Sequence, residues 1–161
     1  MRRAAIVIAL ALFTAGSDPS AAGQPRVAGV WRFEKEVDRR ADRSLVTVGP
    51  ALGYEGILVL TAEGFMSGTV MPRGRKWAVA TASLAELRET IETGTAYSGP
   101  YTVDSTTQTL AIDVSTSLDP GDVGKRLTRH YSLRDDVLSL SGTWAYQGET
   151  LTFTIIFRRI R

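Results

Sequence analysis

The chain of 161 residues contains no cysteine and a single histidine. Without cysteine the protein has no disulfides and no cysteine-linked lipid anchor, so the fold must be stabilised by its hydrophobic core alone. One histidine and no cysteine also leave no Cys–His pair, no zinc cluster and no serine triad with a buried carboxylate orienter. We therefore expect no metal site and no cofactor.

The sequence also lacks a charge imbalance, because 19 basic residues stand against 17 acidic ones. Charges of both signs are interspersed, which argues against a nucleic-acid partner and against an extended anionic-membrane surface. At this length and composition the chain is expected to form one globular domain.

No apolar run in the sequence is long enough for a permanent transmembrane helix, which needs roughly 20 such residues. The longest run, Ala4 to about Ala15, follows two arginines and precedes small residues, which is the pattern of a secretory signal peptide. We expect residues 1–22 to be removed after Ala22. The mature domain, residues 23–161, would then be exported to the periplasm or beyond, with no stable membrane insertion after processing.

Most of the mature region consists of short strand-like runs with turn residues about every eight to twelve positions, the pattern of an antiparallel sandwich or barrel. The expected strands cover residues 28–38, 44–48, 54–61, 65–71, 95–103, 108–115, 125–133, 137–144 and 150–159. One helix is expected at residues 83–94, "SLAELRETIETG", where Ser83 and Glu86 make a capping box. Its apolar stripe of Leu84, Leu87 and Ile91 is expected to pack against the barrel or over its mouth.

Five stretches in order along the chain resemble the bacterial lipocalin-like domain family. They are "GVWRF" at 29–33, "GYEGILVLTAEGFMS" at 53–67, "AYSGPYTVD" at 96–104, "GKRLTRHYSL" at 124–133 and "IIFRR" at 155–159. The resemblance implies an all-β fold, an antiparallel up-and-down barrel of about eight to nine strands with one short helix. It also implies a central cavity, and it implies no particular activity.

In such barrels the first strand lies beside the last, which gives Trp31 and Arg159 a structural role. Strand alternation places Trp31 on one face with Phe33, Lys35 and Val37, and we expect that face to point inward. Arg159 can then stack over the Trp31 indole and close the barrel base. Trp31 is thus predicted to be a structural plug, and Gly29 lets the chain turn tightly before it.

The remaining inward faces are apolar with a few polar points. This composition fits a pocket for an apolar or amphipathic ligand, and it equally fits an interior filled by side chains, which the number of strands favours. Arg129 is the main candidate for contact with a ligand, either as an anchor for a carboxylate or enolate group or as one half of an internal salt bridge. The other ligand-binding candidates are Tyr97, Tyr101, Tyr131 and, more weakly, Lys35. The single histidine, His130, is expected to point outward to solvent.

Three functions remain open at this stage. The first is an exported protein that binds a hydrophobic or amphipathic small molecule in the barrel. The second is a barrel enzyme of the isomerase or cyclase type, with Arg129 stabilising an oxyanion. The third is a structural or interaction module without a ligand. We favour binding, because apolar inward positions are abundant whereas no convincing general base lies near Arg129.

Overall fold

The computed structural model describes residues 27–46, 53–76, 78 and 80–161, so the expected signal peptide, residues 1–22, lies outside the described residues. The strands of the described chain are β1 (Gly29–Arg39), β2 (Leu45–Val46), β3 (Tyr54–Leu60), β4 (Phe65–Pro72), β5 (Thr95–Asp104), β6 (Thr109–Asp113), β7 (Thr116–Ser117), β8 (Arg126–Arg134), β9 (Val137–Tyr146) and β10 (Glu149–Arg159). The helix α1 spans Leu84–Thr93, and a short 3₁₀ turn, η2, spans Pro120–Asp122.

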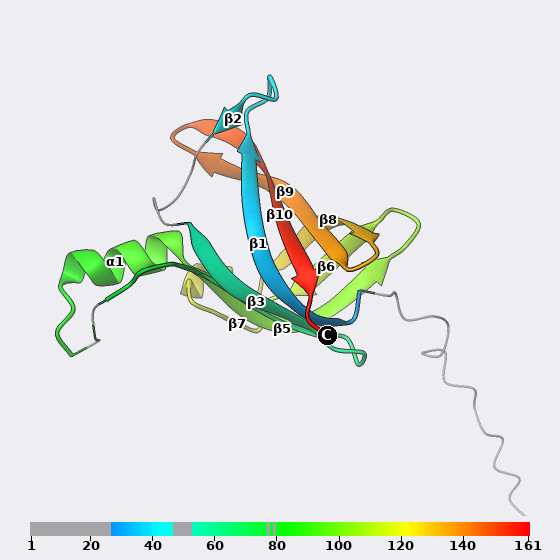
Figure 1. Ribbon diagram of the computed structural model, residues 1–161, viewed down its shortest axis with the longest axis horizontal. Coiled ribbons are helices and arrows are strands. Elements are labelled where there is room, and N and C mark those ends of the chain that lie inside the picture. Colours follow the sequence, from blue (N-terminus) through cyan, green and yellow to red (C-terminus); the bar gives the residue numbers. More distant parts are fainter. Residues whose placement is uncertain (1–26, 47–52, 77, 79) are drawn as a thin grey trace, which may run out of the picture.

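Eight of these strands form a closed antiparallel barrel in the order β1-β3-β4-β5-β6-β8-β9-β10, and β10 returns to pair with β1 (Figure 1). Sequence neighbours are thus spatial neighbours all the way round, which confirms the up-and-down barrel. The short strands β2 and β7 lie outside this ring and pair with β1 and β5.

One end of the barrel is closed by Trp31, whose side chain is 0% exposed. Trp31 pairs with Arg159 across β1 and β10, and the Arg159 guanidinium carbon lies 4.0 Å from the indole centroid. The indole N–H donates to the Val27 carbonyl at 2.9 Å. These contacts hold the buried indole between the first and the last strand of the barrel.

Gly29 has a φ of +148°, a conformation that side-chain-bearing residues rarely adopt. A Cβ placed there would overlap the guanidinium of Arg159, which donates from Nη1 to the Ala28 carbonyl at 2.7 Å. Glycine is therefore required at this position for both the turn and the close approach of Arg159.

A β-bulge in β1 changes which side chains face the interior. Phe33 pairs with Phe157, but the next step pairs Lys35 with Ile156, so Glu34 is the extra residue. Beyond the bulge, Lys35 is exposed and Asp38 is buried. The expectation that Lys35 and Val37 share the inward face of Trp31 is therefore wrong, because one inserted residue reverses a period-two pattern.

The bulge also marks the part of the barrel where β1 leaves β3. β1 pairs with β3 only from Gly29 to Arg32, and then continues along β10 as far as Arg39. In Figure 1 the two strands diverge above their paired segment. β1 and β3 are therefore paired only at the end of the barrel that Trp31 closes.

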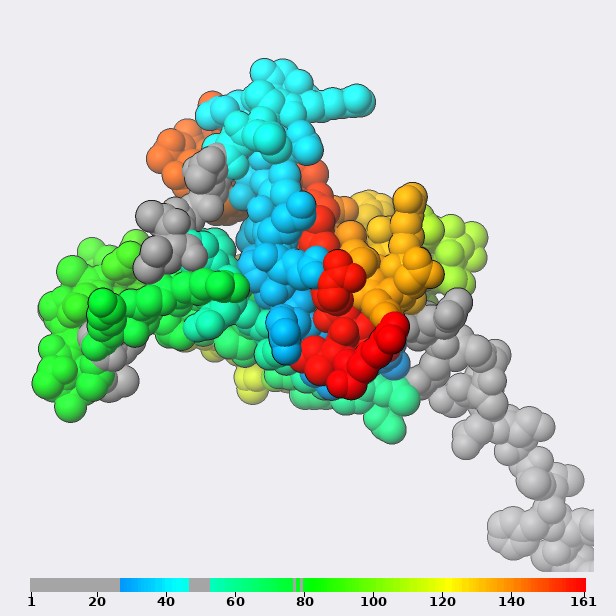
Figure 2. All heavy atoms as spheres, in the orientation of Figure 1, coloured from blue at the N-terminus to red at the C-terminus, as the bar shows by residue number. Residues whose placement is uncertain are grey.

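The capping box of α1 is confirmed, since Ser83 N–H donates to Glu86 Oε2 at 2.8 Å and Glu86 N–H donates to Ser83 Oγ at 3.3 Å. The expected packing of its apolar stripe is wrong. Leu84 is 85% exposed and Ile91 is 52% exposed. Figures 1 and 2 show the helix standing beside the barrel, and Gly94, which caps its carboxyl end, lies against Met71 of β4.

Candidate functional site

A cavity of about 680 Å³ lies within the barrel and is partly open to solvent. The expectation of a filled interior is therefore wrong. Small-molecule sites commonly fall between about 300 and 1,000 Å³. The apolar part of the wall includes Leu58, Met66, Val70, Leu127, Leu140 and Ile155.

Of the side chains predicted to contact a ligand, Arg129 and Tyr97 line the cavity. Tyr101 is buried away from it, and its hydroxyl donates to the Thr61 carbonyl at 2.7 Å. Burial raises the pKa of Tyr101, and the negative charge of Glu63 adds to this. Tyr101 thus tethers the β3–β4 turn.

Two further candidates also lie off the cavity wall. Tyr131 is partly buried against the hydrophobic core, and Lys35 is exposed on the outside of the bulge. His130 is exposed, as expected from its alternation with Arg129. Strand alternation thus predicted correctly which side chains of β8 face inward, and it failed at the β-bulge in β1.

Arg129 stacks on an aromatic ring instead of forming the internal salt bridge considered above. Its guanidinium carbon lies 5.0 Å from the Phe153 centroid, and Nη1 donates to the Thr128 carbonyl at 3.1 Å. No carboxylate of the described residues lies within ion-pair distance of it. Its charge therefore faces the cavity without an acidic partner from the wall.

A glycine on β9, Gly142, makes this stacking possible. Arg129 lies beside Gly142, and Gly142 in turn pairs with Phe153. A Cβ on Gly142 would come within 2.8 Å of the Phe153 ring and 3.4 Å of Arg129 Cδ. Glycine at this point lets the side chains of two non-adjacent strands meet over β9.

The same row of paired residues continues to β1, where Phe153 pairs with Asp38. Three strand spacings separate the backbones of Asp38 and Arg129, or roughly 14 Å along the wall. One step toward the closed end, Glu36 pairs with Ile155, which pairs with Leu140. The cavity thus has an acidic side on β1 and a basic point on β8, with apolar residues between them.

Glu36 and Asp38 are the most perturbed acids of this wall. Desolvation raises the pKa of Glu36 to about 7, and the negative charge of Asp38 adds to the shift. Desolvation also raises the pKa of Asp38, opposed by the hydrogen bond that Trp144 Nε1 donates to Asp38 Oδ1 at 3.1 Å. Asp38 is only 5% exposed, yet no cation of the described residues pairs with either carboxylate.

Aromatic side chains surround this acidic pair. Trp144 and Tyr146 pack with ring centroids 5.2 Å apart, and both line the cavity. Tyr54 lines it from β3, and its pKa is raised by burial and then by the charges of Glu36 and Asp38. The mouth of the cavity therefore combines negative charge with aromatic surface.

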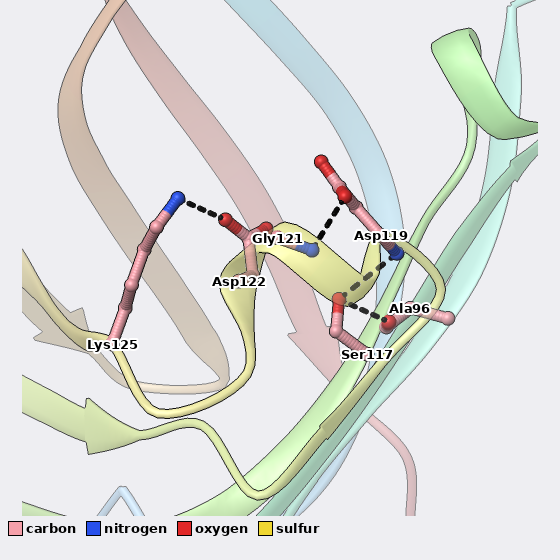
Figure 3. Close-up of polar contacts among 6 residues, drawn as sticks. All are labelled: Ala96, Ser117, Asp119, Gly121, Asp122 and Lys125. Atoms are coloured by element: carbon pink, nitrogen blue, oxygen red, sulfur yellow. Dashed lines mark hydrogen bonds and ion pairs between the residues drawn. The ribbon is translucent and has the colours of Figure 1, made fainter.

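Asp122 also lines the cavity and differs from Glu36 and Asp38 because it has a cationic partner. Its carboxylate accepts from Lys125 Nζ at 2.9 Å, as Figure 3 shows. In the same loop, Asp119 Oδ1 accepts from the Gly121 N–H at 2.8 Å, so the Asp-Pro-Gly-Asp segment is a capped turn. No group of three or more metal-ligating side chains occurs within the part of the chain that the structure describes.

Sequence reasoning missed Glu36 and Asp38 because no periodicity marks the bulge before them. Trp144 and Tyr146, in contrast, continue the even-numbered inward face that begins at Leu138 on β9. Extending that alternation past residue 140 would have placed both aromatic side chains on the inward face of the barrel.

Comparison with known proteins agrees with this architecture. The model of the lipocalin-like domain matches residues 28–160, which covers every strand described above. A search of curated proteins gave no match. Among the described residues, no helix is long and apolar enough to cross a membrane.

Proposed function

The chain belongs to the lipocalin-like domain family, and from this premise we propose that it holds an apolar or amphipathic small molecule inside the barrel. The observation that carries the proposal is the hollow interior of about 680 Å³. That volume falls in the range of small-molecule sites, about 300 to 1,000 Å³. The cavity is partly open to solvent, which gives a ligand access to it.

The lining supports an amphipathic ligand better than a purely apolar one. Most of the wall is aliphatic or aromatic, which favours burial of a hydrocarbon or ring system. Arg129 adds a cation that lacks an acidic partner on the wall, so an acidic group on the ligand would gain a charge-assisted hydrogen bond there. Tyr97 lines the same cavity and offers a phenolic donor.

Export forms part of the proposal and rests on the amino-terminal sequence pattern. If residues 1–22 are a cleaved signal peptide, protein recovered from outside the cytoplasm begins close to Gly23. Amino-terminal sequencing of the recovered protein decides this. Recovery of a cytosolic chain that retains Met1 would refute the export.

Binding is tested by a substitution that places a larger side chain in the cavity from the inward face of β8. Leu127 lines the cavity, whereas its neighbour Thr128 is exposed on the outer face. We expect Leu127→Trp to abolish binding of neutral and charged amphipathic probes, and Thr128→Trp to leave their affinities unchanged, as measured by calorimetry. If no probe binds the folded wild-type domain, a ligand-free structural module is the better account.

The enzyme alternative is favoured by one observation, the position of Glu36. A carboxyl group whose pKa is about 7 has the proton affinity expected of a general base, and it lies in the same cavity as Arg129. Incubation of each bound compound with the protein in deuterium oxide separates the two functions. Deuterium uptake or a changed mass that Glu36→Gln abolishes indicates an enzyme, and recovery of the unchanged compound indicates a binding protein.

A further inference from the structure

We propose that Glu36, Asp38 and the aromatic rings around them form a subsite for a protonated amine, so that the cavity takes a basic amphipath. The inference rests on the proposed binding function and goes beyond it by naming the chemical class of the ligand. It assigns the amine to the mouth of the cavity and the apolar part of the ligand to the interior.

The first argument concerns the two carboxylates on the inward face of β1. Glu36 and Asp38 both face the cavity, and no Lys, Arg or His of the described residues forms an ion pair with them. Asp38 receives one hydrogen bond, from Trp144 to Oδ1, and none of the described residues donates to its other oxygen. Carboxylates removed from water without a cation are costly to the fold. An ammonium group has three donors and one positive charge, so it can donate to both carboxylates and offset one of their charges.

The second argument is the aromatic surface beside the carboxylates. Trp144 and Tyr146 approach from β9, and Tyr54 approaches from β3 on the other side of the opening. A cation held over such rings gains further attraction from their electron-rich faces. An acidic group placed at the same point meets negative charge and ring faces that both repel it. The chemistry of the mouth therefore selects a cation.

The third argument is the direction of the cavity from this point. Ile155 and Leu140 form the wall level with Glu36, and Phe157 and Leu58 continue it toward the closed end. A ligand with its amine at the acids can extend an apolar chain over these residues. Arg129 lies on the far side of Phe153, so an acidic group elsewhere on the same ligand can reach it without meeting the acids.

Binding of 1-decylamine and 1-decanol, which differ in the head group alone, tests the inference by calorimetry at pH 8. We expect the wild-type domain to bind the amine about tenfold or more tightly than the alcohol, the gain of a charge-assisted hydrogen bond. Glu36→Gln and Asp38→Asn should each remove most of that preference and leave the affinity for 1-decanol unchanged. Glu55→Gln, an exposed carboxylate on the adjacent strand, is the matched control and should behave as wild type.

A pH series supplies a second readout. The preference for the amine should weaken from pH 8 to pH 5 in the wild type as Glu36 takes up a proton, and it should change less in Glu36→Gln. The other titratable groups of the lining are Arg129, Tyr54, Tyr97, Tyr146, Glu92 and Asp122. Of these, Glu92 and Asp122 are the other acids, and Glu92→Gln and Asp122→Asn are run as controls for their contribution.

The outcomes separate this inference from the proposed function. Equal affinity for amine and alcohol, or a preference that survives both substitutions, overturns the amine subsite and leaves small-molecule binding intact. Tighter binding of decanoic acid than of decylamine overturns it as well and favours Arg129 as the principal anchor. Failure of all three compounds to bind the folded domain overturns the inference together with the binding function.

Discussion

Replacing Glu36 by glutamine should make the ligand-free fold more stable at alkaline pH, because the native state holds this carboxyl in an environment that disfavours its charge. Its pKa is raised from an ordinary value of 4.5 to about 7, chiefly by desolvation. Between those two values the folded state binds a proton that the unfolded state has released, so the stability from this group is present below pH 4.5 and lost as pH rises through 7. A shift of that size corresponds to about 3 kcal/mol.

Urea unfolding followed by tryptophan fluorescence measures the effect. At pH 5 the free energies of unfolding of wild type and Glu36→Gln should be close, because glutamine resembles the protonated acid. At pH 8 the variant should be more stable by about 2 to 3 kcal/mol, and Glu55→Gln should show no such gain. An equal difference between variant and wild type at both pH values would refute the assignment of Glu36 to the desolvated wall of the cavity.

Two further predictions concern the plug and the basic point of the cavity. Trp31→Ala should lower the free energy of unfolding by about 3 to 5 kcal/mol, because it removes a fully buried indole and leaves a void. A loss under about 1 kcal/mol in denaturant melts would contradict its role as the plug. Arg129→Met should weaken acidic amphipaths by about 1.5 to 3 kcal/mol in calorimetry and leave neutral ones nearly unchanged. His130→Gln should affect neither class, since its side chain is exposed, and a loss of binding in that variant would contradict the strand orientation of β8.

Features set by regular strand alternation could be predicted from the sequence. Trp31 and Arg159 meet because the first and last strands of the barrel pair in register, and Arg129 faces inward because β8 alternates without interruption. The capping box of α1 was equally readable, since it depends on two residues of one turn. These features each need only local pairing rules and the ring closure implied by the family resemblance.

Features that depend on a break in alternation, or on what a surface packs against, could not be predicted. The amphipathic pattern of α1 indicated a helix but not its docking, and Leu84 remains exposed because the helix meets the barrel only near its end. The cavity could not be predicted either, because a strand with inward aliphatic residues has the same sequence pattern whether or not those side chains meet across the barrel. The volume left inside depends on how all the strands close into a ring, and no single strand determines it.

The bulge at Glu34 links the fold to the chemistry of the site. The extra residue lets the Glu34 carboxylate pair with Arg158 on the outer face of the barrel. It also turns Glu36 and Asp38 from outward to inward positions in the part of β1 that has left β3, so both acids line the cavity. Without the bulge, regular alternation would have placed Lys35 on the cavity wall instead of Glu36 and Asp38. The cavity would then have had basic groups on both β1 and β8. The choice between an acid-lined and a base-lined wall thus depends on one residue inserted in β1, which explains why the two acids could not be predicted from the periodicity of β1.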